Sequence, residues 1–147
     1  MMARKEIPFY YCKSRVPLVV FRLRDDSRHV GVIDTGSEVS MFDFGMVEEG
    51  LGTVNTQDET NFVGVNGETA MTTVTRVLDT LRFNTKDGEE VLVPVSGLLY
   101  DMTGLTEVFR RKLKKDTIKI SAIIGADFLK EYDSRIDFRK KTLNVNC

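Results

Sequence analysis

The segment Val30–Ser40 reads VGVIDTGSEVS, and the interpretation of the whole chain starts from it. Val32 and Ile33 predict an apolar β-strand that delivers Asp34 into a turn containing a glycine. Thr35 supplies a hydroxyl group, and Gly36 allows backbone amides to approach the carboxylate closely. The segment therefore presents one aspartate at a strand end, among hydrogen-bond donors. Asp-Thr-Gly alone is also a plausible ordinary turn, so the tripeptide leaves both interpretations open.

Two later segments favour the interpretation as a functional site. Residues 62–67 read FVGVNG, and their Asn66-Gly67 pair is the strongest hairpin signal in the chain, because both central positions of a type I′ turn need positive φ. Residues 122–129 read AIIGADFL, an apolar strand that ends at a glycine and is followed by a short helical pattern. Both segments follow Asp34 in the sequence. The order along the chain is therefore the strand-end aspartate, the glycine-rich hairpin, and the apolar strand with its helix.

Together the three segments resemble the retropepsin-like, or retroviral-type, aspartic peptidases. The resemblance covers roughly residues 16–147 and implies a mainly β fold, a closed acid-protease barrel with one or two helices and one lobe per chain. It also implies a single domain over residues 1–147. A helical insertion is expected at about residues 98–118 and is longer than in compact viral enzymes, which favours a cellular or bacterial member of the family.

The chain departs from the retroviral pattern at two further positions. Ser37 stands where retroviral enzymes usually have alanine, although serine is common there in the two-lobed pepsin relatives. Ala126 stands where many retroviral members carry arginine, so the salt link made by that arginine is not expected in this protein.

The resemblance assigns roles to particular residues. Asp34 is the catalytic carboxylate, Thr35 hydrogen-bonds across a dimer beneath the catalytic pair, and Gly36 helps to orient the carboxylate. The flap is Val63–Thr69, which closes over an extended peptide. The residues predicted to bind substrate are Ser37, Gly64, Val65, Asn66, Gly67 and Ile124. Val65 and Ile124 are also plausible as ordinary core residues.

The chemistry of this family needs two carboxylates close together, and the chain has one Asp-Thr-Gly. Asp127 is expected to cap a short helix, and Asp43, Asp133 and Asp137 lack the Thr-Gly context. A homodimer whose two-fold axis joins two copies of Asp34 is therefore predicted. The terminal segment Thr142–Val145 alternates cleanly, and the resemblance implies that it is an edge strand that pairs with its symmetry mate, because the family uses terminal strands for dimerisation.

Three functional hypotheses follow. The first is a homodimeric aspartic endopeptidase that acts on an extended peptide or protein substrate, with best activity at mildly acidic pH. The second is a catalytically silent dimeric module of the same fold that binds peptides or serves as a scaffold, because fold does not guarantee function. The third is a monomer with unrelated chemistry. The intact Asp34, Thr35 and Gly36 favour the first.

Strand signals dominate the rest of the chain, and we expect two hairpins. One joins Val16–Arg24 to Arg28–Ile33, and the other turns at residues 86–88. Strands are also predicted at 61–65, 68–78, 118–124, 134–138 and 142–145. Helical patterns are predicted at 105–113 and 127–132, and a loop at Phe42–Gln57. His29 is interpreted as a surface or hairpin residue.

Composition excludes several other functions. The chain has 147 residues, 21 Lys plus Arg, 22 Asp plus Glu and a net charge of −1, which argues against nucleic acid as a main partner. One histidine and two cysteines, Cys12 and Cys147, cannot build a two-histidine metal site or a disulfide framework. No metal or other cofactor is expected. The apolar runs are too short for a membrane span or a signal peptide, so a cytoplasmic protein is expected.

Overall fold

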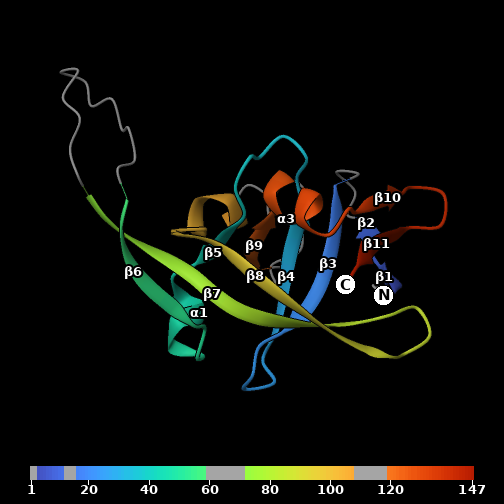
Figure 1. Ribbon diagram of the computed structural model, residues 1–147, viewed down its shortest axis with the longest axis horizontal. Helices are drawn as coiled ribbons and strands as arrows, with labels where there is room; N and C mark the ends of the chain where they lie inside the picture. The colour runs from blue at the N-terminus through green and yellow to red at the C-terminus, as the bar shows by residue number, and fades with distance from the viewer. Residues whose placement is uncertain (1–2, 12–15, 59–71, 108–118) are drawn as a thin grey trace.

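The computed structural model describes residues 3–11, 16–58, 72–107 and 119–147 (Figure 1). Eleven strands and two short helices have bounds within these ranges, and residues 103–107 add a further helical segment. The elements are β1 (Arg4–Pro8), β2 (Tyr10–Tyr11), β3 (Pro17–Arg22), β4 (Arg28–Ile33), β5 (Met41–Asp43), α1 (Gly45–Glu48), β6 (Thr53–Asp58), β7 (Thr72–Asn84), β8 (Glu90–Tyr100), β9 (Ile120–Ile124), α3 (Ala126–Glu131), β10 (Arg135–Asp137) and β11 (Thr142–Asn146).

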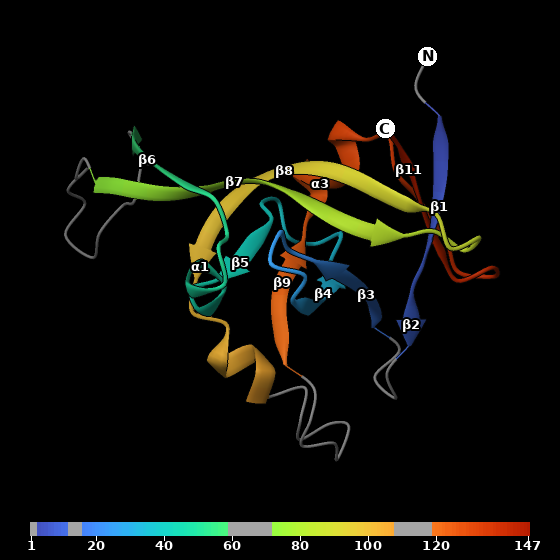
Figure 2. The same cartoon turned by 90° about the horizontal axis from the view of Figure 1, so that it is seen from below.

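Six strands close into a barrel in the order β3-β4-β9-β5-β8-β7, and the pairing of Arg22 on β3 with Arg82 on β7 closes the ring. β7 and β8 form a long twisted pair that arches over β3, β4 and β9 (Figure 2). β6 and β2 extend the sheet at its two ends. The predicted mainly β, closed barrel is confirmed.

The barrel interior is filled by side chains from alternating strand positions. β8 shows the period of two most clearly, because Val91, Val93 and Val95 are buried while the residues between them are exposed. Phe42 and Phe83 are fully buried in the same core. Burying one such side chain stabilises a fold by about 1.5–3 kcal/mol relative to leaving it in water.

Both predicted hairpins that lie within the described residues are present. β3 and β4 pair antiparallel, as do β7 and β8. Gly88 in the second turn has a φ of 82°, a conformation in which glycine avoids the steric cost of a side chain. The predicted strands at 118–124, 134–138 and 142–145 correspond to β9, β10 and β11.

Two sequence-based predictions are wrong. Residues 42–57 are not a loop, because β5 ends there and α1 and most of β6 lie within it. β1 lies before the segment that the resemblance covers, and all five of its residues pair with β11, with Ile7 1% exposed. β11 is not an edge strand, because it lies between β1 and β10 in a second, three-stranded sheet. Both errors concern strand pairing, because β6 pairs with β7 and β11 pairs with β1 from the opposite end of the chain.

The predicted insertion at about residues 98–118 is described only in part. Residues 98–100 continue β8, residues 103–107 are helical, and residues 108–118 lie outside the described residues. No helix in the described part of the chain is long and apolar enough to cross a membrane.

Candidate active site

Asp34 lies where two neighbouring parallel strands of the barrel end together. β4 pairs with β9, with Ile33 opposite Ile124. The backbone N–H of Asp34 donates a hydrogen bond to the carbonyl oxygen of Ile124, at 3.0 Å. Because β4 has neighbours on both sides, β3 and β9, the position of its last residue is fixed by the barrel wall. The side chain of Asp34 is exposed beyond that end.

The turn after β4 orients the Asp34 carboxylate. The Gly36 N–H donates to Oδ1 of Asp34 at 2.9 Å, and the Ser37 N–H donates to the Asp34 carbonyl oxygen at 3.2 Å. A Cβ atom at Gly36 would lie 3.3 Å from that same Oδ1, so a side chain there would crowd the carboxylate. The predicted role of Gly36 in orienting Asp34 agrees with this geometry within one chain.

The loop that follows is attached to the start of α3 through backbone hydrogen bonds. Ala126 N–H donates to the Ser37 carbonyl oxygen at 2.7 Å, and Asp127 N–H donates to the Glu38 carbonyl oxygen at 3.2 Å. A Cβ atom at Gly125 would lie 2.8 Å from backbone atoms of Val39, so only glycine allows this approach. These contacts are main-chain, and they attach the loop without an arginine at position 126.

Ser40 and Asp127 form the side-chain part of the same attachment. The Ser40 hydroxyl donates to Oδ1 of Asp127 at 2.6 Å, and the Ser40 N–H donates to Oδ2 at 3.0 Å. The same hydroxyl oxygen accepts the Gly125 N–H at 2.9 Å. Asp127 is therefore not the helix cap predicted from the sequence. Gly125 occupies the N-cap position, and the carboxylate holds the active-site loop instead.

A cavity of about 440 Å³ opens beside Asp34. Its lining is apolar except for the Asp-Thr pair, and Asp34 is the one carboxylate among the described residues that line it. The lining residues are Val16, Pro17, Val32, Ile33, Asp34, Thr35, Leu105, Ile123, Ile136 and Phe138. A hollow of this kind, with a few polar groups in an apolar wall, is typical of a ligand site.

The predicted substrate-binding residues have different outcomes. Ile124 is fully buried in the barrel core, which was the alternative to its substrate-binding role, and its neighbour Ile123 lines the cavity. Strand alternation explains the difference, because adjacent residues face opposite sides of a sheet. Ser37 is half-buried in the loop, with its hydroxyl donating to the Val39 carbonyl oxygen at 2.8 Å. The predicted flap, with Gly64, Val65, Asn66 and Gly67, lies outside the described residues.

His29 lies in β4, opposite Phe21 of the predicted hairpin, and it is buried, so the hairpin placement is confirmed and the surface placement is wrong. Its Nε2 lies 2.7 Å from Oε2 of Glu49, and its Nδ1 lies 3.2 Å from Oγ of Ser121 on β9. Its ring also stacks on Phe21 at 5.7 Å between centroids. Burial lowers the pKa of His29, and the Glu49 carboxylate opposes that shift less strongly. The imidazole therefore joins β4, β9 and the segment after α1.

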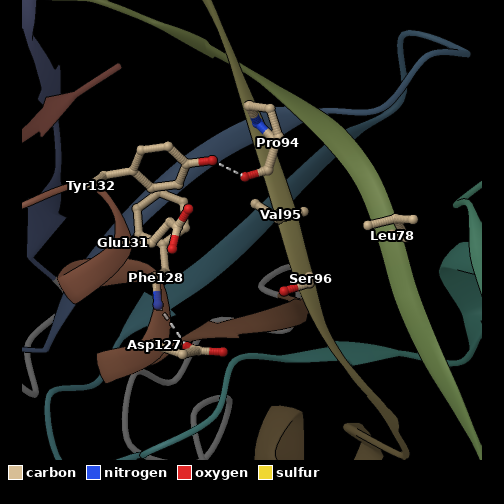
Figure 3. Close-up of a pocket in the computed structure, with 8 residues that line it drawn as sticks. All are labelled: Leu78, Pro94, Val95, Ser96, Asp127, Phe128, Glu131 and Tyr132. Carbon is tan, nitrogen blue, oxygen red and sulfur yellow. Dashed lines mark hydrogen bonds between the residues drawn. The ribbon is translucent and has the colours of Figure 1, made fainter. Parts of the chain in front are cut away.

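A second cavity, of about 290 Å³, lies between α3 and the strands β7 and β8 (Figure 3). The Tyr132 hydroxyl donates to the Pro94 carbonyl oxygen across it, and burial raises the pKa of Tyr132. Asp127 lines this cavity, but its carboxylate is engaged by Ser40 and by the Phe128 N–H. The cavity beside Asp34 is therefore the better candidate for chemistry.

Within the described ranges, no three His, Cys, Asp or Glu side chains are grouped to hold a metal ion.

Comparisons with known proteins identify the fold. The retroviral protease-like domain of Ddi1 from Leishmania major superposes with a TM-score of 0.52 at 14% identity, covering 93% of each chain. A retropepsin-like aspartic protease from Rickettsia conorii gives a TM-score of 0.46 at 14% identity, covering 99% of this chain and 94% of that one. No protein-family model and no curated protein sequence matches this chain. The barrel thus has a retropepsin-like fold.

Proposed function

We propose that this protein is an aspartic endopeptidase, in which two chains form a homodimer and hydrolyse a peptide bond between two copies of Asp34. The observation that carries the proposal is the geometry of Asp34. It stands at the end of a barrel strand, its carboxylate is oriented by the Gly36 amide, and it borders an apolar cavity. The retropepsin-like fold supports a hydrolase of this type.

The second carboxylate has to come from a second chain. Asp34 is the one carboxylate on the cavity wall among the described residues, and Asp127 is bound to Ser40. In a single chain both Asp34 and Thr35 are exposed to solvent. A two-fold axis beside them brings the two Asp34 side chains together, and Thr35 then hydrogen-bonds beneath the pair. Within the described strands of the small sheet, a second copy can add only at β1 or β10.

The reaction divides the work between the two carboxylates. Like charges held a few Å apart do not both ionise easily, so the pair shares one proton. The ionised carboxylate accepts a proton from a water molecule as the water oxygen attacks the scissile carbonyl carbon, and the protonated carboxyl donates its proton to the carbonyl oxygen. Collapse of the resulting diol breaks the C–N bond, and a proton passes to the leaving amine.

The substrate is an unstructured peptide segment with apolar side chains next to the cleaved bond. Ile123, Val32 and Leu105 offer apolar surface beside Asp34. An extended peptide hydrogen-bonds through its main chain, and its side chains then enter such hollows on alternate sides. The predicted flap, Val63–Thr69, closes over the bound peptide and excludes water.

Substitution of Asp34 tests the proposal. Purified wild type should cleave members of an unstructured peptide library at mildly acidic pH, and Asp34→Asn should reduce the rate by on the order of a thousandfold or more, because asparagine cannot accept the proton from water. Asp87→Asn, in an exposed turn before Gly88, is the matched control and should retain full activity. Full activity in Asp34→Asn would refute the proposal. Peptide binding without cleavage at any pH would instead support the silent peptide-binding module.

A further inference from the structure

Three arginines lie side by side on the outer face of the barrel, where β3, β4 and β7 meet. Arg22 on β3 is paired directly with Arg28 on β4, and on its other side with Arg82 on β7. Residues paired across neighbouring strands project from the same face of the sheet, so the three guanidinium groups share one surface. Like charges placed directly opposite each other destabilise a sheet, and this arrangement therefore needs a compensating negative charge.

The compensation within the chain is incomplete. The Asp26 carboxylate contacts Arg82 and lies 3.7 Å from Arg22, and Glu90 lies 3.8 Å from Arg82. Arg28 makes no ion pair with any residue that the structure describes. Among the described residues, three guanidinium groups thus share two carboxylates, and the exposed guanidinium group of Arg28 pairs with neither.

The same three arginines line a small cavity of about 160 Å³. The segment from β1 to β2 forms another wall, with Pro8 and Tyr10, and Asn84 adds an amide group. No carboxylate is among the described lining residues, which are Pro8, Tyr10, Val20, Phe21, Arg22, Arg28, Arg82 and Asn84. A water molecule in the liquid occupies about 30 Å³, so the cavity has room for a compact oxyanion.

We propose that this arginine cavity binds a phosphate-type oxyanion. Guanidinium groups present paired N–H donors that match the oxygen atoms of phosphate. A tetrahedral dianion can accept from all three arginines, and from the Asn84 amide, whereas a planar carboxylate has two oxygens and one charge. The phosphate belongs either to free phosphate or to a phosphorylated side chain, which present the same group.

The arginine cavity is separate from the candidate active site. Arg28 begins β4 and Asp34 directly follows its last residue, so they stand about 20 Å apart along an extended strand. The proposal therefore does not depend on proteolysis, and its test needs no cleavage assay.

The test measures thermal unfolding and amide NMR spectra of the full chain with inorganic phosphate, against sodium chloride of equal ionic strength. Phosphate should raise the unfolding temperature and shift signals of β3, β4 and β7. A second arm replaces phosphate with a short phosphoserine peptide and its unphosphorylated form. If the phosphopeptide binds more tightly than inorganic phosphate, the site is assigned to a phosphorylated side chain. If inorganic phosphate binds more tightly than the phosphopeptide, the site is assigned to the free ion.

Arg28→Gln is the decisive variant. Because Arg28 has no ion pair with the described residues, its loss should leave stability without phosphate unchanged or slightly higher, yet weaken phosphate binding at least about tenfold. Arg139→Gln, at an exposed position in the β10–β11 turn, removes the same charge and should bind phosphate like wild type. Phosphate effects no larger than those of chloride, or equal loss of binding in both variants, would overturn the proposal.

Discussion

His29 shows how a single residue depends on distant parts of the chain. One polar neighbour, Ser27, is two residues away, but Glu49 and Ser121 come from the segment after α1 and from β9. A sequence window around position 29 contains neither Glu49 nor Ser121, so it does not indicate that the imidazole is buried. Asp34 was predicted correctly as the strand-end carboxylate because the groups that define it, Ile33 and Gly36, lie next to it in the sequence.

The burial of His29 predicts a pH dependence of stability. Burial lowers its pKa in the folded state, while the unfolded chain keeps the ordinary value of about 6.5. Lys119 also lowers the pKa, and Glu49 and Asp25 raise it. The unfolded state therefore takes up the proton first, so the free energy of unfolding should fall as pH drops below about 6.5 and through the folded pKa.

This prediction can be measured directly, since the chain contains one histidine. Urea unfolding of wild type at pH 7.5 and at successively lower pH should show the fall in the free energy of unfolding. His29→Gln should make this fall smaller between about pH 6.5 and the folded pKa of His29. NMR titration of the single imidazole gives its pKa independently. A folded-state pKa at or above the ordinary value would contradict the account, because the histidine would then leave stability unchanged or raise it on acidification.

At the scale of elements, the active-site loop and α3 act as one unit. The loop that carries Asp34 contacts the helix through two backbone hydrogen bonds and through the Ser40–Asp127 pair. The Ser37-x-x-Ser40 spacing was visible in the sequence. Its partner was not, because Asp127 lies 87 positions further on.

Ser40→Ala tests this unit. The substitution removes the hydroxyl that donates to Asp127 and leaves the buried Gly125 N–H without its acceptor. We expect a loss of about 1–3 kcal/mol in the free energy of unfolding, measured by urea denaturation. We also expect a lower kcat with little change in KM, because the displaced loop carries the Asp34 carboxylate. Ser96→Ala, at an exposed position on β8, is the control and should change neither.

Local sequence patterns predicted the β3–β4 and β7–β8 hairpins and located β9, β10 and β11, but they missed β1 and β6. The β3–β4 and β7–β8 hairpins have apolar alternation on both arms and turn residues between them. β1 pairs with β11 from the opposite end of the chain, and no local signal marks that contact. β6 reads TVNTQD and carries little apolar alternation, so its pairing with β7 could not be inferred.

At the scale of the whole molecule, the barrel closes through one pairing between β3 and β7. Several neighbouring strands of the barrel are far apart in the sequence. Composition and hydrophobic periodicity do not indicate which of these distant strands pair. The closed barrel was expected from the family resemblance, and the structure confirms it. The homodimer and the peptidase activity stay proposals, and both depend on two chains sharing one site.

The most direct test of the shared site is a mixing experiment. Wild type and Asp34→Asn chains are refolded together in varied proportions at constant total protein, so that subunits pair at random, and the initial cleavage rate is measured. If each site needs two Asp34 carboxylates, the rate follows the square of the wild-type fraction, and an equal mixture retains about a quarter of the wild-type rate. A rate proportional to the wild-type fraction itself would show that each chain cleaves alone, and would contradict the account.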